Sequence, residues 1–135
     1  MVSLNQLLKK MLNRLNGIFN WVTEEYDFNG WHVVKYRNGW CKLYYRQSFS
    51  ATSSGWNAWG NAYVKDVAAI NYPVIFESVP FQSAELQTSA NSGWLDIGWN
   101  TVSDTGHHQI NRPSSGTNFN AWIIYRVYGR LGGTE

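Results

Sequence analysis

The hydrophobic pattern of the chain changes character after residue 22. In the first segment, apolar residues are spaced alternately three and four positions apart, at Met1, Leu4, Leu8, Met11, Leu15, Ile18 and Val22. This is the a/d spacing of a coiled-coil seam about three heptads long. Good helix formers fill the positions between them, and Ser3 is suited to cap the helix, although no acid follows at the capping-box position. The pattern therefore predicts an amphipathic helix within residues 1–22, over about 3–18.

The width of the apolar stripe leaves the partner of this helix open. Leu7, Leu12 and Phe19 flank the seam, so the stripe suits either a three-stranded bundle or a helix that lies on its own domain. The heptads alone would also allow a dimer. We expect self-association, because a single helix of this length with only part of one face buried would be marginal.

Residues 31–135 have a different pattern, in which short aromatic and β-branched runs alternate with Gly, Asn and Ser. Acids and Asn29-Gly30 in 23–30 indicate a linker before them. Asn38-Gly39 separates two such runs, 31–37 and 40–47, and predicts a β-hairpin with a type I′ turn. A polar loop is expected at 48–61. Further strands are expected at 62–68, 72–79, 83–90, 93–101, 105–111 and 119–130.

Closely spaced short strands with turn signals between them are typical of an antiparallel sandwich. The predicted fold is therefore all-β: a sandwich of about six to eight strands in residues 31–135, preceded by the helix and the linker. The composition agrees, because the 135 residues include 8 Trp, 8 Tyr and 6 Phe while only 15% are charged. Such a chain is not disordered and has aromatic side chains to spare for its surface.

The net charge and the length of the apolar runs limit which partners the chain can have. The formal net charge of +2 is too small to indicate a nucleic-acid partner. No segment approaches the run of about 20 apolar residues that membrane insertion requires. Lys9, Lys10 and Arg14 also interrupt the apolar stretch that a signal peptide would need. The single cysteine, Cys41, excludes an intramolecular disulfide and is expected to be a packing residue.

Five motifs, in order along the chain, resemble the C-terminal tip domains of phage and prophage tail fibres. The segment 31–42 resembles the hairpin of that family, in which a lysine and an aromatic residue precede Asn/Asp-Gly. Residues 56–63 resemble its Trp-x-x-Trp-Gly segment, and 72–80 its Tyr-Pro, Phe and aliphatic-Pro strand pair. Residues 110–116 resemble the stretch before its last strand, and 125–130 its closing Gly-Arg. The resemblance covers roughly residues 31–130.

This resemblance implies a function that the composition does not show. Members of the family are similar to the H-type lectin sandwich, form trimers that often follow a coiled coil, and are taken to bind glycans on the host surface. The resemblance thus implies a homotrimer in a virion tail, with a bacterial cell-surface glycan as ligand. Other tail proteins would join at the N-terminus.

The chain offers few groups for catalysis. It has no Gly-rich phosphate loop, Cys-x-x-Cys or nucleophile elbow. Glu85 and Asp96 are the two acids that could face each other across neighbouring strands as a glycosidase requires. His107 and His108 are adjacent, so on a strand they point to opposite faces and do not share one ion. We therefore expect a non-enzymatic binding module without a metal or cofactor.

Glycan binding uses aromatic rings that stack on sugars and polar side chains that bond to hydroxyls. Trp56 and Trp59 lie in a polar loop, where binding residues are common, while Trp94 and Trp99 are assigned partly to the core. Asn100, Asp104 and His107 are the expected hydrogen-bonding residues. The alternatives are a purely structural domain that trimerises and ends a fibre and, ranked last, a hydrolase of cell-wall polysaccharide that uses Glu85 or Asp96.

Overall fold

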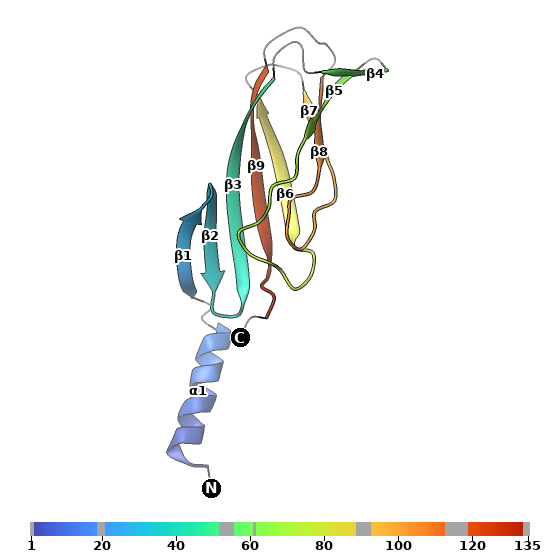
Figure 1. Ribbon diagram of the computed structural model, residues 1–135. Coiled ribbons are helices and arrows are strands. Elements are labelled where there is room, and N and C mark those ends of the chain that lie inside the picture. The colour runs from blue at the N-terminus through green and yellow to red at the C-terminus, as the bar shows by residue number, and fades with distance from the viewer. Residues whose placement is uncertain are drawn as a thin grey trace.

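A computed structural model shows one helix joined to a β-rich head (Figure 1). It describes residues 2–18, 21–51, 56–60, 62–88, 93–112 and 119–133. Within them, the elements are α1 (Leu4–Ile18), β1 (Val22–Phe28), β2 (Trp31–Tyr36), β3 (Trp40–Ala51), β4 (Asn57–Trp59), β5 (Ala62–Val67), β6 (Phe81–Thr88), β7 (Trp94–Ile97), β8 (His108–Arg112) and β9 (Phe119–Arg130).

The strands form two antiparallel sheets that enclose one hydrophobic core. Sheet A has the order β1-β2-β3-β9-β6, and sheet B has the order β4-β5-β8-β7. Both sheets contribute fully buried side chains, such as Val33 and Ile123 from sheet A and Ile110 from sheet B. The expected antiparallel, sandwich-like head is therefore confirmed. It has nine strands in the described residues rather than six to eight.

The longest strand pair, β3 with β9, lies at the centre of sheet A. Its register runs without a break from Trp40↔Arg130 to Ala51↔Phe119. Along β3, Cys41 and Leu43 are buried in the core, whereas Lys42 and Tyr44 point to solvent. Burial raises the pKa of the Cys41 thiol to about 11, as suits a packing residue. The pair thus gives sheet A one apolar face and one face open to ligands.

The segment that the sequence indicated as a linker, 23–30, instead forms most of β1. Strand β1 pairs with β2 along the edge of sheet A. Tyr26 packs against the core, while its neighbours Glu25 and Asp27 point outward. The acids suggested a linker, but an edge strand tolerates charges on its solvent side. Val22, expected at the end of the helical seam, is the first residue of this strand.

The type I′ geometry expected at Asn38-Gly39 is found instead at Asn29-Gly30, which the sequence assigned to the linker. Asn29 and Gly30 have φ angles of 48° and 85°, as the two central positions of a type I′ hairpin require. Gly39 has a positive φ of 88°, but Asn38 does not. The Gly39 amide instead donates to the Tyr36 carbonyl and closes a turn. Gly39 itself, with its left-handed backbone, then connects this turn to β3. The predicted hairpin therefore exists, with a three-residue connection.

The strand expected at 72–79 is absent, and an irregular segment replaces it. Pro73 and Pro80 have no N–H group to donate to a sheet. Two isolated bridges hold the segment, Asn71↔Asp104 and Phe76↔Leu131. Tyr72 and Phe76 are buried, with their rings edge-on at 5.5 Å between centroids. Core packing rather than strand pairing therefore fixes this part of the chain.

Helix α1 projects beyond the head as a separate stalk (Figure 1). Ser3 caps it as expected: the Gln6 amide donates to Ser3 Oγ, and the Ser3 amide donates to Gln6 Oε1. This is a capping box completed by glutamine in place of an acid. Within the described ranges, the helix has no contact with any strand. The alternative that its apolar stripe covers its own domain is therefore wrong.

The seam residues whose side chains the structure describes are solvent-exposed in the single chain. Leu4 is 70% exposed, Leu8 and Met11 are each 53% exposed, and Leu15 is 44% exposed. Ile18 ends the helix, and its side chain lies outside the described part of the structure. A single chain thus leaves one apolar helix face open to water.

Ionic hydrogen bonds around His32 of β2 hold the edge strand β1 in place. We call His32, Glu25 and Asp27 the clamp. The Nδ1 atom of His32 lies 2.6 Å from Asp27 Oδ1, and its Nε2 lies 2.9 Å from Glu25 Oε1. Because carboxylates only accept hydrogen bonds, both ring nitrogens donate when His32 is protonated. The hydrogen bonds to Asp27 and Glu25 therefore raise the pKa of His32 above its ordinary value.

This clamp predicts a pH dependence of stability. The folded protein holds the His32 proton more tightly, so the clamp contributes fully below about pH 6.5 and its contribution is lost as pH rises through the raised pKa. Chemical denaturation of wild type and His32→Gln at about pH 6 and pH 8.5 measures this. We expect the advantage of wild type to shrink at the higher pH, and to shrink less in an Asp27→Asn background. An advantage that grows with pH would contradict the clamp.

Candidate functional site

The two tryptophans expected to bind a ligand lie at the end of the head farthest from α1, where β4 is found (Figure 1). They differ in exposure. Trp59 ends β4 and is 69% exposed. Trp56 is half-buried and packs against the core, with the Arg112 guanidinium 5.9 Å from its ring centroid. Trp59 is therefore available to a ligand, whereas Trp56 serves packing.

Asn100 and Asp104 hold the chain in place around residues 98–107. The Asn100 amide donates to the Tyr72 hydroxyl at 3.2 Å and to the Pro80 carbonyl at 2.9 Å. Asp104 Oδ1 accepts the Gly106 amide at 2.8 Å, within its own turn. Both side chains are half-buried, so their hydrogen bonds are used inside the protein. In the structure these two side chains stabilise the loop conformation and do not form part of a binding surface.

His107 and His108 point in different directions, as the sequence predicted. His107 is exposed, whereas His108 is buried and its Nδ1 accepts the Gly98 amide at 2.9 Å. Burial, and secondly the nearby His107, lower the pKa of His108, which keeps this ring neutral. Only His107 can therefore meet a ligand.

Glu85 and Asp96 do not form a carboxylate pair. Glu85 lies on β6 in sheet A, where its Oε2 is 3.2 Å from Arg126 Nη1 on the outer face. Asp96 lies on β7 in sheet B, where its Oδ2 accepts the Asn111 amide at 2.7 Å. The two acids stand on opposite outer faces of the head, so this route to glycoside hydrolysis is wrong.

A row of polar side chains crosses the outer face of sheet B. In the strand register, Asp66 of β5 stands opposite Gln109 of β8, which stands opposite Asp96 of β7. The neighbouring β8 residues, His108 and Ile110, are buried, which places Gln109 on the solvent side. The Gln109 amide donates to Asp66 Oδ1 at 3.0 Å. We call Asp66, Gln109 and Asp96, together with Asn111, a buried residue whose amide donates to Asp96, the polar row.

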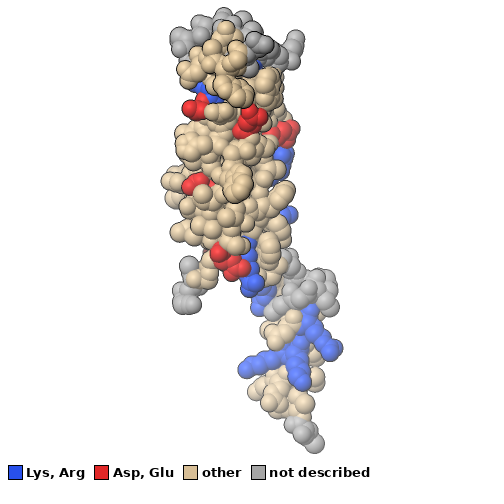
Figure 2. Space-filling model, turned by 90° about the vertical axis from the view of Figure 1, so that its right-hand side faces the viewer, with Lys and Arg blue, Asp and Glu red and all other residues tan. Residues whose placement is uncertain are grey.

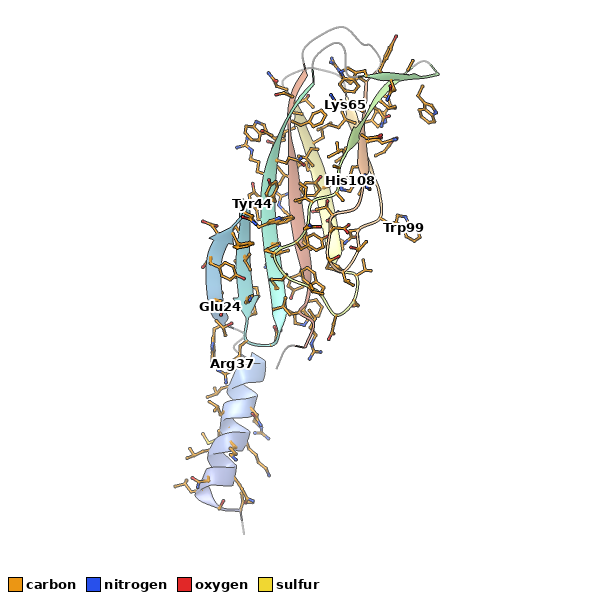
Figure 3. All side chains as sticks on the ribbon, in the orientation of Figure 1. Glu24, Arg37, Tyr44, Lys65, Trp99 and His108 are labelled. Atoms are coloured by element: carbon orange, nitrogen blue, oxygen red, sulfur yellow. The ribbon has the colours of Figure 1, made fainter. Side chains whose placement is uncertain are left out.

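Three exposed tryptophans lie on sheet B or directly after its strand β7. Trp94 stands opposite Asn111 at the start of β7 and is 47% exposed. Trp99 follows β7 and is 93% exposed, and Figure 3 shows its ring pointing away from the head. Neither tryptophan belongs to the buried core to which the sequence assigned it in part. We define the sheet B site as the polar row together with Trp59, Trp94 and Trp99.

The sheet B site contains a shallow hollow of about 270 Å³. Its lining combines the polar Asp66, Asp96, Gln109, His107 and His108 with Ile97 and Gly98. Seen from the right-hand side of Figure 1, the surface is mainly uncharged with single carboxylates set into it (Figure 2). Carboxylates and amides that face solvent beside flat rings can bond to hydroxyls while the rings stack on C–H groups.

Sequence reasoning found Trp59 and His107 of this site but not the polar row. The signal was limited to Gln109, the one exposed polar residue of β8, which stands between buried His108 and Ile110. The row was missed because the pairing of β8 with β5 and β7 decides which acids stand beside that amide. No sequence pattern shows that pairing.

Comparisons with known proteins neither add to nor narrow this picture: no family model, curated protein or solved structure matches the chain. Among the described residues, no group of three or more His, Cys, Asp and Glu side chains is placed to hold a metal ion. No helix in the described ranges has the length and apolar character needed to cross a membrane.

Proposed function

We propose that the chain is a non-enzymatic carbohydrate-binding head on an oligomerising helical stalk. The observation that carries the proposal is the sheet B site, where exposed Trp59, Trp94 and Trp99 accompany a row of carboxylates and amides. Exposed indole rings cost free energy in water, so their presence on the sheet that carries these hydrogen-bonding residues favours a ligand with both C–H faces and hydroxyls. A sugar has both.

The proposed biological setting is the tip of a phage or prophage tail fibre, bound to a bacterial cell-surface glycan. Support for this setting comes from the order of the five motifs. The head also presents Trp59 at the end opposite α1, as a tip on a shaft would (Figure 1). In this setting the protein belongs to the virion tail, and other tail proteins join at its N-terminus.

The proposed assembly is a homotrimer built through the seam of α1. Leu4, Leu8 and Met11 are exposed in the single chain, and no strand in the described part of the structure covers them. Burial of their side chains against two other helices would remove this apolar face from water. Three heads on one stalk would also raise the apparent affinity of weak single sites through effective concentration.

The sugar-binding proposal is tested by a matched pair of tryptophan variants. Trp94→Ala removes a ring of the sheet B site, whereas Trp122→Ala removes a similarly exposed ring on sheet A. On a glycan array and on whole bacterial cells, we expect Trp94→Ala to weaken binding by about tenfold, or about 1.4 kcal/mol. Trp122→Ala should stay within about twofold of wild type.

Unchanged melting temperatures would show that both variants fold. Absence of any glycan or cell binding by wild type would favour the structural alternative, in which the head only ends a fibre. An equal loss in both variants would place the site elsewhere.

The stalk proposal is tested by comparing two variants, one with a charge at a seam position and one with the same charge outside the seam. Leu8→Lys puts an ammonium group at a seam position, whereas Asn13→Lys puts the same group at an exposed helix position outside the seam. In sedimentation equilibrium we expect trimers for wild type and Asn13→Lys, and dissociation for Leu8→Lys. A monomeric wild type would contradict the stalk, and a trimeric Leu8→Lys would place the association in the head.

A further inference from the structure

The outer face of sheet A carries a second hollow, a groove of about 420 Å³. This volume is within the range of about 300–1,000 Å³ usual for small-molecule sites. Two rows of the strand register form its floor. One row runs Val34, Lys42, Tyr128 and Phe81, and the other runs His32, Tyr44, Arg126 and Ser83. Tyr44 is labelled in Figure 3, on the central strand β3.

Cations and aromatic rings alternate across the centre of this groove. Lys42 stands opposite Tyr128, and Tyr44 stands opposite Arg126, so the two cations lie on one diagonal and the two rings on the other. The Lys42 ammonium lies 5.6 Å from the Tyr128 ring centroid, and the Arg126 guanidinium lies 5.9 Å from that of Tyr44. Each ring therefore helps to hold a cation in place.

The two cations of the groove differ in their ion pairing. No carboxylate belongs to the lining residues of the groove. Arg126 contacts Glu85, which lies outside the groove, at 3.2 Å. Lys42 forms no ion pair with any residue in the described part of the chain. An anion that enters the groove would thus meet an ammonium group with no competing carboxylate.

The rings of the groove are accessible and held in fixed positions. Tyr44 and Tyr128 remain partly exposed, and Phe81 at the groove edge is 72% exposed. Trp40 stacks on Tyr128, with centroids 4.7 Å apart and planes 26° apart, which fixes the orientation of this tyrosine. Rings held in this way lose little freedom when a ligand stacks on them.

A second copy of the chain fits this groove less well than an anionic ligand does. Burial of Lys42 against a copy would need a carboxylate from that copy to avoid an unpaired buried charge. The acids of sheet A that contact residues lining the groove are already bonded there: Glu25 and Asp27 to His32, and Glu85 to Arg126. Charge complementarity therefore favours an external anion.

We propose that this groove binds an acidic saccharide, with a sugar ring on Tyr44 and Tyr128 and its carboxylate between Lys42 and Arg126. The anion accounts for the Lys42 ammonium, with Arg126 shared between Glu85 and the ligand, and the sugar ring accounts for the aromatic floor. The groove lies on the face opposite the sheet B site, so the inference does not rest on binding there. An acidic peptide shares the charge but has no ring to stack, and serves as the contrasting probe.

Isothermal titration calorimetry with oligogalacturonate, a uronic-acid oligomer, tests the inference on the full chain. We expect binding that Lys42→Gln weakens by about tenfold, because it removes a charge-assisted contact. Arg46→Gln is the matched control: it removes the same charge from the same strand, but Arg46 lies over Trp122 outside the groove. We expect it to change the affinity by no more than about twofold.

Two further arms separate a saccharide site from simple charge attraction. Fully methyl-esterified oligogalacturonate and a polyglutamate of equal charge should each bind at least about tenfold more weakly than the acid form. Phe81→Ser, at the exposed groove edge, should weaken binding while Trp94→Ala leaves it unchanged. Unchanged binding with Trp94→Ala separates this groove from the sheet B site.

Equal losses in Lys42→Gln and Arg46→Gln, or polyglutamate binding as tight as that of the acid sugar, would overturn the inference. So would a complete lack of oligogalacturonate binding. A change of oligomeric state in sugar-free Lys42→Gln would identify the groove as a contact between copies and would also overturn it.

Discussion

The pairing of β3 with β9 is the interaction on which the rest of the head depends. Its register is continuous over the full length of both strands, and it decides which side chains point inward. Leu43, Tyr125 and Val127 enter the core, while Lys42, Tyr44 and Arg126 face solvent. A slip by one residue would exchange these two sets, burying charges and exposing the core. The groove on sheet A exists only in this register.

Sheet B depends on the same core but presents a different chemistry. Ile110 and Val67 anchor it against sheet A, and this fixes the solvent side of β8 and its neighbours. Carboxylates and amides follow there beside exposed tryptophans, whereas sheet A offers cations beside tyrosines. The two outer faces therefore offer different hydrogen-bonding groups, and we propose an acidic sugar for the face of sheet A only. A stalk that joins several heads would combine both kinds of contact.

Patterns in neighbouring residues predicted the helix, its cap and the β2–β3 hairpin. They could not predict which distant strands pair. The helix, its Ser3 cap and the hairpin at Asn38-Gly39 depend on neighbouring residues, and all are present. Strand β1 was missed because a run of acidic residues is typical of a linker. Only the folded structure shows that His32 lies beside Glu25 and Asp27 and pairs with them. The segment 72–79 has strand-like residues, but its prolines and core contacts outweigh that propensity. The polar row of the sheet B site depends entirely on strand order.

Amide hydrogen exchange tests the central claim, that the β3–β9 pair is the most stable part of the head. Slow exchange marks the segments that open only when the whole domain unfolds. The account predicts that amides in the centre of β3 and β9 exchange slowest, at least about tenfold more slowly than those of the short edge strand β4. Exchange in β3 and β9 as fast as in β4 would contradict it, because the faces on either side would then have no stable framework.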